Sequence, residues 1–406
     1  MSAAAATPRA ATAGRIVGEV AGGFGDIGLL APLAVALITL NHLNATVVLA
    51  GAGLFYIATA LTYRLPVPVQ PLKAVSAIAI ASGLGASAIG AAGLMIGAVF
   101  VLLSVTGLAT WLQRVFVKPV VRGIQLGIGL LLALAAVGML ARPAQLTVAD
   151  GPLVSVGVVL AVAIGLTVAF CLLAFNRAGL PGGALLLLGA GAALGLAVGV
   201  HPVVDVALGP APLILRLPSA FDFASAFWLL VVPQVGLSIG NSLVATAATA
   251  RRYFGEAARG VTTRRLALTM GLANLAVSPL GGMPMCHGAG GMTAHVKTGA
   301  RTGLGTGVFG AVLVVLGVAL GGTAPAVVGV LPPAVLGGFL LYVGLQHVTL
   351  AADLRGWMEI SVAAVVAVIA VVTGNISLGV VAGLGVCWLV SLWRSRRAAP
   401  PAPPAR

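Results

Sequence analysis

The chain has 406 residues, of which 60% are hydrophobic and 7% charged, and its mean hydropathy is +1.14. Soluble domains contain about a quarter charged residues, so this composition excludes a soluble enzyme, a nucleic-acid-binding module and a disordered chain. The formal charge of +14 is spread in ones and twos between apolar runs, as loop charges of membrane proteins are. The composition therefore predicts an all-α polytopic membrane protein whose partner is the lipid bilayer rather than a nucleic acid.

The two ends of the chain and its cysteines predict no additional domain. Residues 1–15 lack the apolar stretch and cleavage site of a signal peptide, so we expect a cytoplasmic tail, and 398–406 form a Pro/Ala-rich tail. Cys171, Cys286 and Cys387 are far apart and lie in apolar stretches. Their spacing predicts no disulfide framework, no metal site and no cofactor.

A bilayer core about 30 Å thick requires about 20 apolar residues per helix. Apolar segments that predict about fourteen spans lie at 16–40, 45–63, 70–86, 89–111, 118–140, 153–175, 182–200, 224–249, 265–280, 285–298, 303–321, 333–350, 358–373 and 376–393. The third and tenth are short or interrupted by Pro and Gly. These two are predicted to be broken half-helices.

The distribution of Lys and Arg predicts the orientation of the spans. With fourteen spans and the N-terminus inside, only Arg142 and Arg216 fall in outside loops and Lys73 falls within a span. All other Lys and Arg residues then lie on the cytoplasmic side, as the positive-inside rule requires. We therefore expect a multi-pass protein of the cell membrane, such as a bacterial inner membrane, with both termini cytoplasmic.

Two pairs of similar segments indicate an internal repeat. KPVVRG at 118–123 resembles PPAVLG at 332–337, an offset of 214, and GDIGL at 25–29 resembles PQVGL at 233–237, an offset of 208. The two short spans also correspond at about this offset. An odd number of spans in each half places the halves in opposite orientation, so the sequence predicts two inverted repeats of seven spans.

The third span begins with three prolines within PVPVQP, at 66–71. Proline lacks an N–H and fixes φ, so we expect extended backbone followed by a helix that begins near Pro71. Lys73 then lies about one turn into a helix whose N-terminus faces a cavity near the midplane, with Gln70 beside it. The alternative is a loop with a lysine that reaches the membrane surface.

The tenth span begins in GGMPMCHGAGG at 281–291, and its helix is expected to start near Met285 or Cys286. Glycines leave the backbone bare for a ligand, and His287 either hydrogen-bonds an anion, carries a proton or has only a structural role. Two helix N-termini that meet from opposite halves suit a divalent oxyanion. The candidate substrate-binding residues are Gln70, Pro71, Lys73, Met285, Cys286, His287, Gly288, Ala289 and Gly290, with Gln234 opposite them.

Two further polar positions are candidates for coupling or gating. Asp26 is an acidic residue well within the first span, where it carries a coupling proton or makes a structural hydrogen bond. In the eighth span, Gln234, Ser238, Asn241 and Ser242 recur at helical spacing and partly share one face. They line the cavity or join helices to one another.

VPVQPLKAV and GGMPMCHGAGGMTAHVKTGARTG, together with GGFGDIG in the first span, resemble signature segments of the molybdate transporter family. That family is related to the SulP sulfate permeases, and the sequence predicts no STAS domain of the kind that those permeases usually append. The resemblance covers about 16–393 and implies the fold of seven plus seven inverted spans. It also implies a core domain of 16–112 and 224–322, a gate domain of 113–223 and 323–397, and a substrate held between the third and tenth spans.

These observations predict a secondary transporter, not an enzyme, for a tetrahedral oxyanion: molybdate first and sulfate next. The core would move against the gate in an alternating-access, elevator-type cycle, with a proton as a candidate co-substrate and a homodimer left open. One alternative is a nucleobase permease of the same fold, which tends to place carboxylates in spans eight and ten, where this chain has Gln234 and His287. The other is an anion channel.

Overall fold

The computed structural model describes residues 8–109, 111, 115–141, 144–146, 154–180, 182–197 and 208–397. The first helix begins at Pro8, inside the stretch expected to be a tail, and proline is suited to a first helical turn. Residues 1–7 and 398–406 lie outside the described part, as do Arg114, Arg142 and Asp205.

The first half is a run of helices with one short strand, β1, and one antiparallel strand pair, β2 and β3. Its elements are α1 (Pro8–Gly23), α2 (Ile27–Leu40), α3 (Ala45–Tyr63), β1 (Gln70–Pro71), α4 (Lys73–Ser82), α5 (Ala86–Thr106), α7 (Lys118–Ala141), β2 (Ala144–Leu146), β3 (Val154–Val156), α8 (Val158–Ala178) and α9 (Gly183–Ala197).

The second half repeats this order. A continuous helical run contains α10 (Ala220–Ala226), η1 (Phe227–Val231), α11 (Val232–Ser238), η2 (Ile239–Ala245) and α12 (Thr246–Phe254), where η1 and η2 are π-helical. It is followed by η3 (Gly255–Gly260), α13 (Thr263–Val277), η4 (Ser278–Leu280), β4 (Met285–Cys286), α14 (Ala289–Lys297), α15 (Gly303–Leu320), α16 (Ala324–Gly329), α17 (Pro333–Thr349), η5 (Leu350–Asp353), α18 (Gly356–Thr373) and α19 (Ile376–Arg397).

Each of the fourteen predicted spans is occupied by helix, and nine helical segments of the described chain are long and apolar enough to cross a membrane. The third and tenth spans are the short helices α4 and α14, as predicted. The chain is therefore an all-α, multi-pass membrane protein.

Helix contacts follow an internal two-fold relation between the halves. α3 packs against α15, and the equivalent pair, α13 and α5, is also in contact. In the same way, α7 contacts α18 while its counterpart α17 contacts α8. Exchanging the two halves thus maps one set of contacts onto the other, which confirms the inverted repeat.

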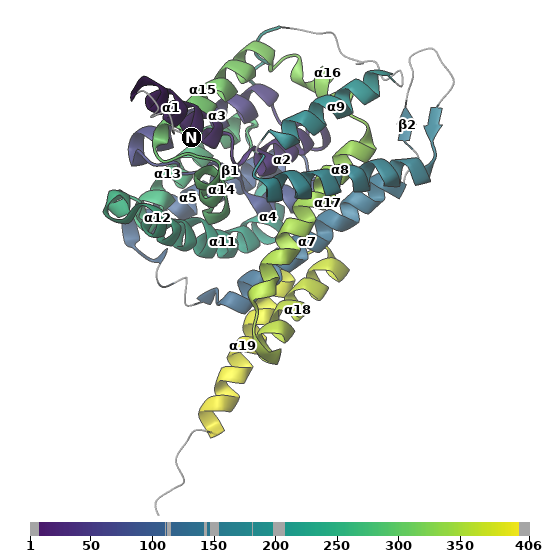
Figure 1. Cartoon of the computed structure of the whole chain (residues 1–406). Helices are drawn as coiled ribbons and strands as arrows, with labels where there is room; N and C mark the ends of the chain where they lie inside the picture. Colours follow the sequence, from purple (N-terminus) through teal and green to yellow (C-terminus); the bar gives the residue numbers. More distant parts are fainter. Residues whose placement is uncertain are drawn as a thin grey trace, which may run out of the picture.

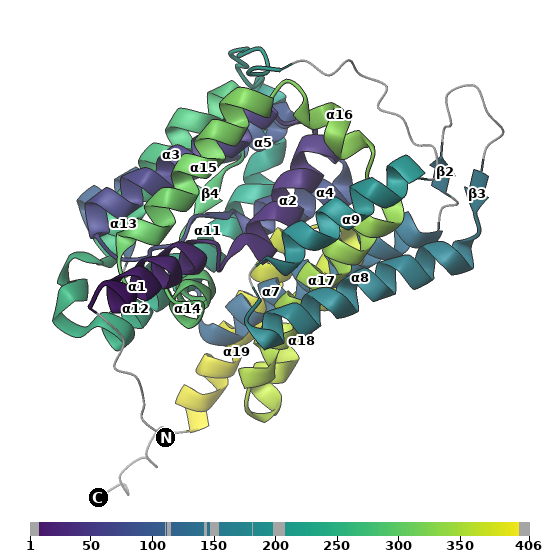
Figure 2. The same ribbon diagram turned by 45° about the horizontal axis from the view of Figure 1, so that its top comes forward.

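The helices form two groups, which both Figure 1 and Figure 2 separate. α3, α5, α13 and α15 lie together on one side, and α7, α8, α17, α18 and α19 lie on the other. The interrupted spans lie between the two groups. α2 contacts α3 of the first group and α17 of the second, and α4 contacts α5 of the first group and α7 of the second.

Three helix starts differ from the sequence-based expectation. The first span is interrupted at 24–26, so that Asp26 precedes α2 instead of lying within a continuous helix. α4 begins at Lys73 rather than Pro71, and α14 begins at Ala289 rather than Met285 or Cys286. The later starts arise because residues 70–71 and 285–286 pair as strands, and extended backbone cannot also be helical.

Candidate functional site

The two interrupted spans cross as a short antiparallel pair of strands. Gln70 lies opposite Cys286 and Pro71 opposite Met285, and the Leu72 N–H donates to the Pro284 carbonyl at 2.9 Å. The prolines of the first segment keep it extended, as predicted, and pairing satisfies backbone groups that would otherwise be unpaired in the membrane. The strand pair fixes where α4 and α14 begin.

Side chains from neighbouring helices hold this crossing in place. Asn274 of α13 accepts from the Met285 N–H at 2.6 Å and donates to the Met285 carbonyl at 2.9 Å. His287 has its Nδ1 2.9 Å from the Pro68 carbonyl and its Nε2 2.9 Å from the Thr269 hydroxyl. Asn274 is not among the predicted site residues, because its position within an apolar helix carries no motif.

Gln234 occupies a different place from the cavity wall expected for it. Its Oε1 accepts from the N–H groups of Ala74 at 2.8 Å and Val75 at 3.2 Å, and its Nε2 donates to Ser238. These two N–H groups belong to the first turn of α4, which has no capping side chain of its own. Gln234 therefore caps α4 from the opposite half, and the two N–H groups are not free for an anion.

A chain of polar side chains leads from α4 to the break in the first span. Lys73 donates from Nζ to Gln70 Oε1 at 2.7 Å, and Gln70 Nε2 donates to Asp26 Oδ2. Gln70 and Asp26 are buried. Among the described residues, Lys73 reaches Asp26 only through Gln70.

Glycines of α14 allow Gln70 to lie directly against the backbone. A Cβ added at Gly291 would lie 2.4 Å from Asp26 Oδ2 and 2.5 Å from Gln70 Nε2, and one at Gly288 would lie 2.2 Å from Gln70 Oε1. A Cβ at Gly290, in contrast, would meet open space. Glycine is thus required at 288 and 291, because a side chain there would collide with Gln70 or Asp26. At 290 glycine leaves the N-terminus of α14 uncovered.

These groups face a cavity of about 270 Å³ between the two helix groups. Five of the candidate residues line it: Asp26, Gln70, Lys73, Asn241 and Gly290. The other candidates do not line it: Pro71, Met285, Cys286, His287, Gly288, Ala289 and Gln234.

The opposite wall contains polar side chains that are not among the predicted site residues. Gln125 comes from α7, Asn176 from α8, and Tyr342, Gln346 and His347 from α17. Gln346 donates to the Tyr342 hydroxyl at 3.0 Å. Polar residues spaced at i, i+4 and i+5 in an otherwise apolar span are a weak signal that would have pointed to α17.

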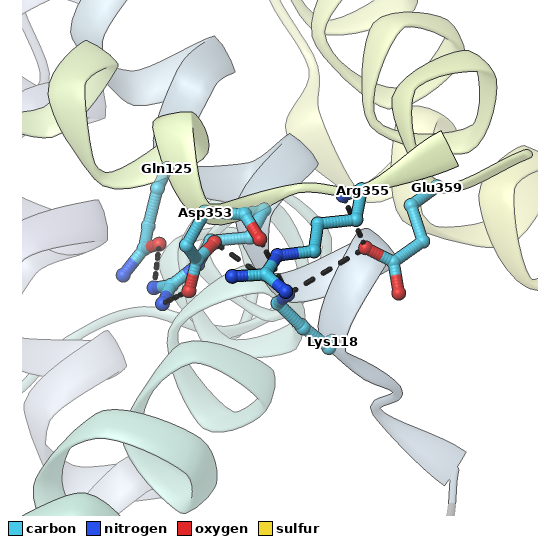
Figure 3. Close-up of polar contacts among 6 residues, drawn as sticks. Lys118, Gln125, Asp353, Arg355 and Glu359 are labelled. Atoms are coloured by element: carbon cyan, nitrogen blue, oxygen red, sulfur yellow. Dashed lines mark hydrogen bonds and ion pairs between the residues drawn. The ribbon is translucent and has the colours of Figure 1, made fainter. Parts of the chain in front are cut away.

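Gln125 is tied to an ion-pair network at the end of α7, shown in Figure 3. Arg122 Nη1 donates to Gln125 Oε1 at 2.8 Å, while its Nε donates to Asp353 Oδ1 at 2.8 Å. Lys118 joins the same network through Asp353 and Glu359. Because Arg122 holds the oxygen of the Gln125 amide, the NH₂ group is the end left to face the cavity.

Solved structures of other membrane proteins have the same fold. The transmembrane domain of the cyanobacterium bicarbonate transporter BicA superposes with a TM-score of 0.63 at 17% identity, covering 92% of this chain and 97% of BicA. SLC26A9 superposes with a TM-score of 0.65 at 14% identity, covering 95% of this chain and 67% of that one. The chain therefore has the inverted-repeat membrane fold that these two proteins share.

The sequence comparisons identify the family. The family model described as "Molybdate transporter of MFS superfamily" matches residues 18–132 and 226–346, two segments whose starts are 208 residues apart. Molybdate transporter 1 of Arabidopsis thaliana is 30% identical over 368 residues, covering 83% of this chain and 80% of the relative. Molybdate transporter 2 of the same plant is 26% identical over 407 residues, covering 92% and 87%. The chain belongs to the molybdate transporter family.

Proposed function

We propose that this protein is a secondary active transporter, not an enzyme, that carries a tetrahedral oxyanion, molybdate first and sulfate next. Family membership supports this proposal, because the relatives are named molybdate transporters. The observation that carries it is the cavity of about 270 Å³ in which Lys73 and the start of α14 lie on one wall and amide side chains on the other.

The α14 wall supplies donors suited to an anion. Gly290 and Gly291 line the cavity, and their N–H groups lie in the first turn of α14, have no intrahelical acceptor and receive no cap from Gly288. The positive end of the helix dipole lies at the same place, and Lys73 adds a full charge. A dianion is thereby neutralised in part, which is compatible with release as well as binding.

The other candidate residues support this wall rather than contact the anion. Pro71, Met285 and Cys286 form the strand pair, His287 holds the Pro68 carbonyl, and Gln234 caps α4. We propose that Asp26 orients Gln70, and through it Lys73, by accepting the Gln70 amide hydrogen bond. Asn241, on the π-helical turn η2, contributes a polar group to the cavity itself.

We propose that transport proceeds by movement of one helix group against the other. The strand pair, α4 and α14 belong to the core formed by 16–112 and 224–322, and the opposite wall belongs to the gate formed by 113–223 and 323–397. Because the anion is held mainly by the core, an elevator-type displacement of the core would carry it past the gate. A cell-membrane location with both termini cytoplasmic, and a homodimer, remain predictions.

Uptake of radiolabelled molybdate into proteoliposomes, with sulfate, tungstate or uracil as competitor, tests the proposal. We expect tungstate and sulfate to compete and uracil to have no effect, because the site supplies hydrogen-bond donors and positive charge. Accumulation of molybdate above its external concentration under an imposed ion gradient separates a transporter from an anion channel. Competition by uracil, or conductance without accumulation, would refute it.

A further inference from the structure

A histidine on the gate side of the cavity has no role in the site described so far. His347 lies in the last turn of α17, is 2% exposed and lines the cavity. Its Nδ1 lies 2.8 Å from the Val343 carbonyl, and its Nε2 has no hydrogen-bond partner among the described residues. Buried polar atoms are almost always paired, so an unpaired ring nitrogen beside a cavity requires an explanation.

The hydrogen bond to Val343 determines which nitrogen is free to react. A carbonyl oxygen only accepts, so Nδ1 carries the hydrogen, and in the neutral ring Nε2 holds the lone pair. Neutral His347 therefore presents a proton acceptor to the cavity. Protonated His347 presents an N–H donor of positive charge, which suits an oxyanion.

Two other buried histidines lack the combination of an unpaired Nε2 and a position in the cavity lining. His287 has both ring nitrogens within hydrogen-bond distance of a partner. His295 resembles His347, since its Nδ1 lies 2.8 Å from the Gly22 carbonyl and its Nε2 is unpaired, but it packs against Tyr56 and does not line the cavity. His295 thus provides a matched control with the same local bonding.

The charged groups around His347 determine when a proton is favourable there. Titratable groups on the elements packed against α17 are Lys118 and Arg122 on α7, Cys171 and Arg177 on α8, Asp26 before α2 and Asp353 in η5. Of these only Asp26 lines the cavity, together with Tyr342 on α17 itself and Lys73 across from it. In the empty cavity a protonated His347 would be repelled by the Lys73 ammonium. When a dianion is bound, the His347 imidazolium and the Lys73 ammonium would both be attracted to it.

We propose that His347 is the proton-binding residue of this transporter. On anion binding, the Nε2 lone pair takes a proton from a hydronium ion of the solution that fills the open cavity, which leaves a water molecule, and the new N–H donates to an anion oxygen. On release to the other side, the proton returns to water and Nε2 regains its lone pair. Anion and proton thereby bind with positive coupling, and each raises the affinity for the other by the same factor.

The placement of His347 on the gate links proton binding to the transport cycle. Lys73, Gln70 and the start of α14 belong to the proposed core, while His347 lies on α17, in the second helix group. The anion thus contacts both walls only when they approach each other. This inference rests on the proposed oxyanion transport, of which it specifies the coupling.

Calorimetric titration of the purified protein with molybdate and, separately, with sulfate tests the inference. Titrations in two buffers of different ionisation enthalpy give the number of protons taken up for each anion bound. We expect the wild type to take up about one proton per anion and to bind more tightly as pH falls, by at most about tenfold per pH unit. The measurements extend over about pH 5 to 8, where histidines titrate.

Two variants remove the titrating group while keeping a hydrogen-bonding side chain. His347→Asn retains a donor near the Nδ1 position for the Val343 carbonyl, and His347→Gln retains an amide near the Nε2 position. Both are expected to bind the anion with proton uptake lost, while His295→Gln, with its thermal stability measured in parallel, keeps the wild-type proton uptake.

Each contrary result has a distinct meaning. A wild type that binds an anion without proton uptake, or His347 variants that retain proton uptake, would overturn the role of His347 and leave the proposed function intact. Proton uptake lost in Asp26→Asn and kept in His347→Gln would assign the proton to Asp26 instead, which also overturns it. A wild type that binds neither anion would refute the proposed function, and this inference with it.

Discussion

Lys73 and Gln70 fix one another's orientation, with 2.7 Å between the Lys73 Nζ and the Gln70 Oε1. An ammonium only donates, so the oxygen of the amide must face Lys73, and the NH₂ group must then face Asp26. The Gln70 amide thus connects the Lys73 ammonium to the Asp26 carboxylate, and these two charged groups do not contact each other directly. This connection places Lys73 at the cavity with its charge only partly compensated.

Lys73→Ala is expected to weaken molybdate binding by about 10- to 100-fold, the effect of losing a hydrogen bond from a charged donor worth about 1.5–3 kcal/mol. Membrane abundance should remain near that of the wild type, because the strand pair itself is unchanged. Titration calorimetry and uptake measure the loss. Lys297→Ala is the control, since Lys297 is exposed and outside the cavity lining. Wild-type affinity in Lys73→Ala would remove Lys73 from the site.

Asp26→Asn retains an oxygen that accepts from Gln70, so we expect most of the uptake to remain and its pH profile to be unchanged. Asp26→Leu leaves the buried Gln70 NH₂ unpaired, at a cost of about 1–3 kcal/mol, and should lower affinity about tenfold by releasing Lys73 from its position. Uptake measured across pH distinguishes the two variants. An altered pH profile in Asp26→Asn would contradict a purely orienting role.

Gly291→Ala and Gly290→Ala form a matched pair on one helical turn. The alanine methyl at position 291 would collide with Asp26 and Gln70, whereas at position 290 it meets open space. We expect Gly291→Ala to destabilise the protein by about 1–3 kcal/mol, the usual cost of overpacking, and to abolish uptake. Gly290→Ala should fold normally. Equal melting temperatures for the two variants would show that the close approach is unimportant.

Arg122→Ala is expected to reduce anion affinity because it releases the Gln125 oxygen, after which the amide can rotate away from the cavity. Stability should change by less than about 1 kcal/mol, since Arg122 and Asp353 form a partly exposed ion pair. Lys118→Ala, which disturbs the same network without contacting Gln125, should leave affinity unchanged. The contrast is measured by binding and thermal unfolding. Equal losses in both variants would contradict an orienting role for Arg122.

The spans, the extended segment and two charged cavity residues could be predicted from the sequence, because they depend on local chemistry. Apolar length determined the fourteen spans, and the prolines at 66, 68 and 71 determined an extended segment, because proline cannot donate a backbone hydrogen bond. The offsets of 208 and 214 identified the inverted repeat. Lys73 and Asp26 stood out because charges are costly within the membrane, and both line the cavity.

The partners of each polar side chain were decided only by the tertiary structure. Gln234 looked like a cavity residue, but it caps α4 from 160 positions away, and Asn274 clamps Met285 without any motif. Gln125 gave no distinct signal and His347 only a weak one, since the sequence does not show whether a polar residue in an apolar helix contacts another side chain, a backbone group or a cavity. Which partner a polar side chain meets depends on how the two repeats pack. Packing alone determines which helix faces enclose the cavity and which are buried against each other.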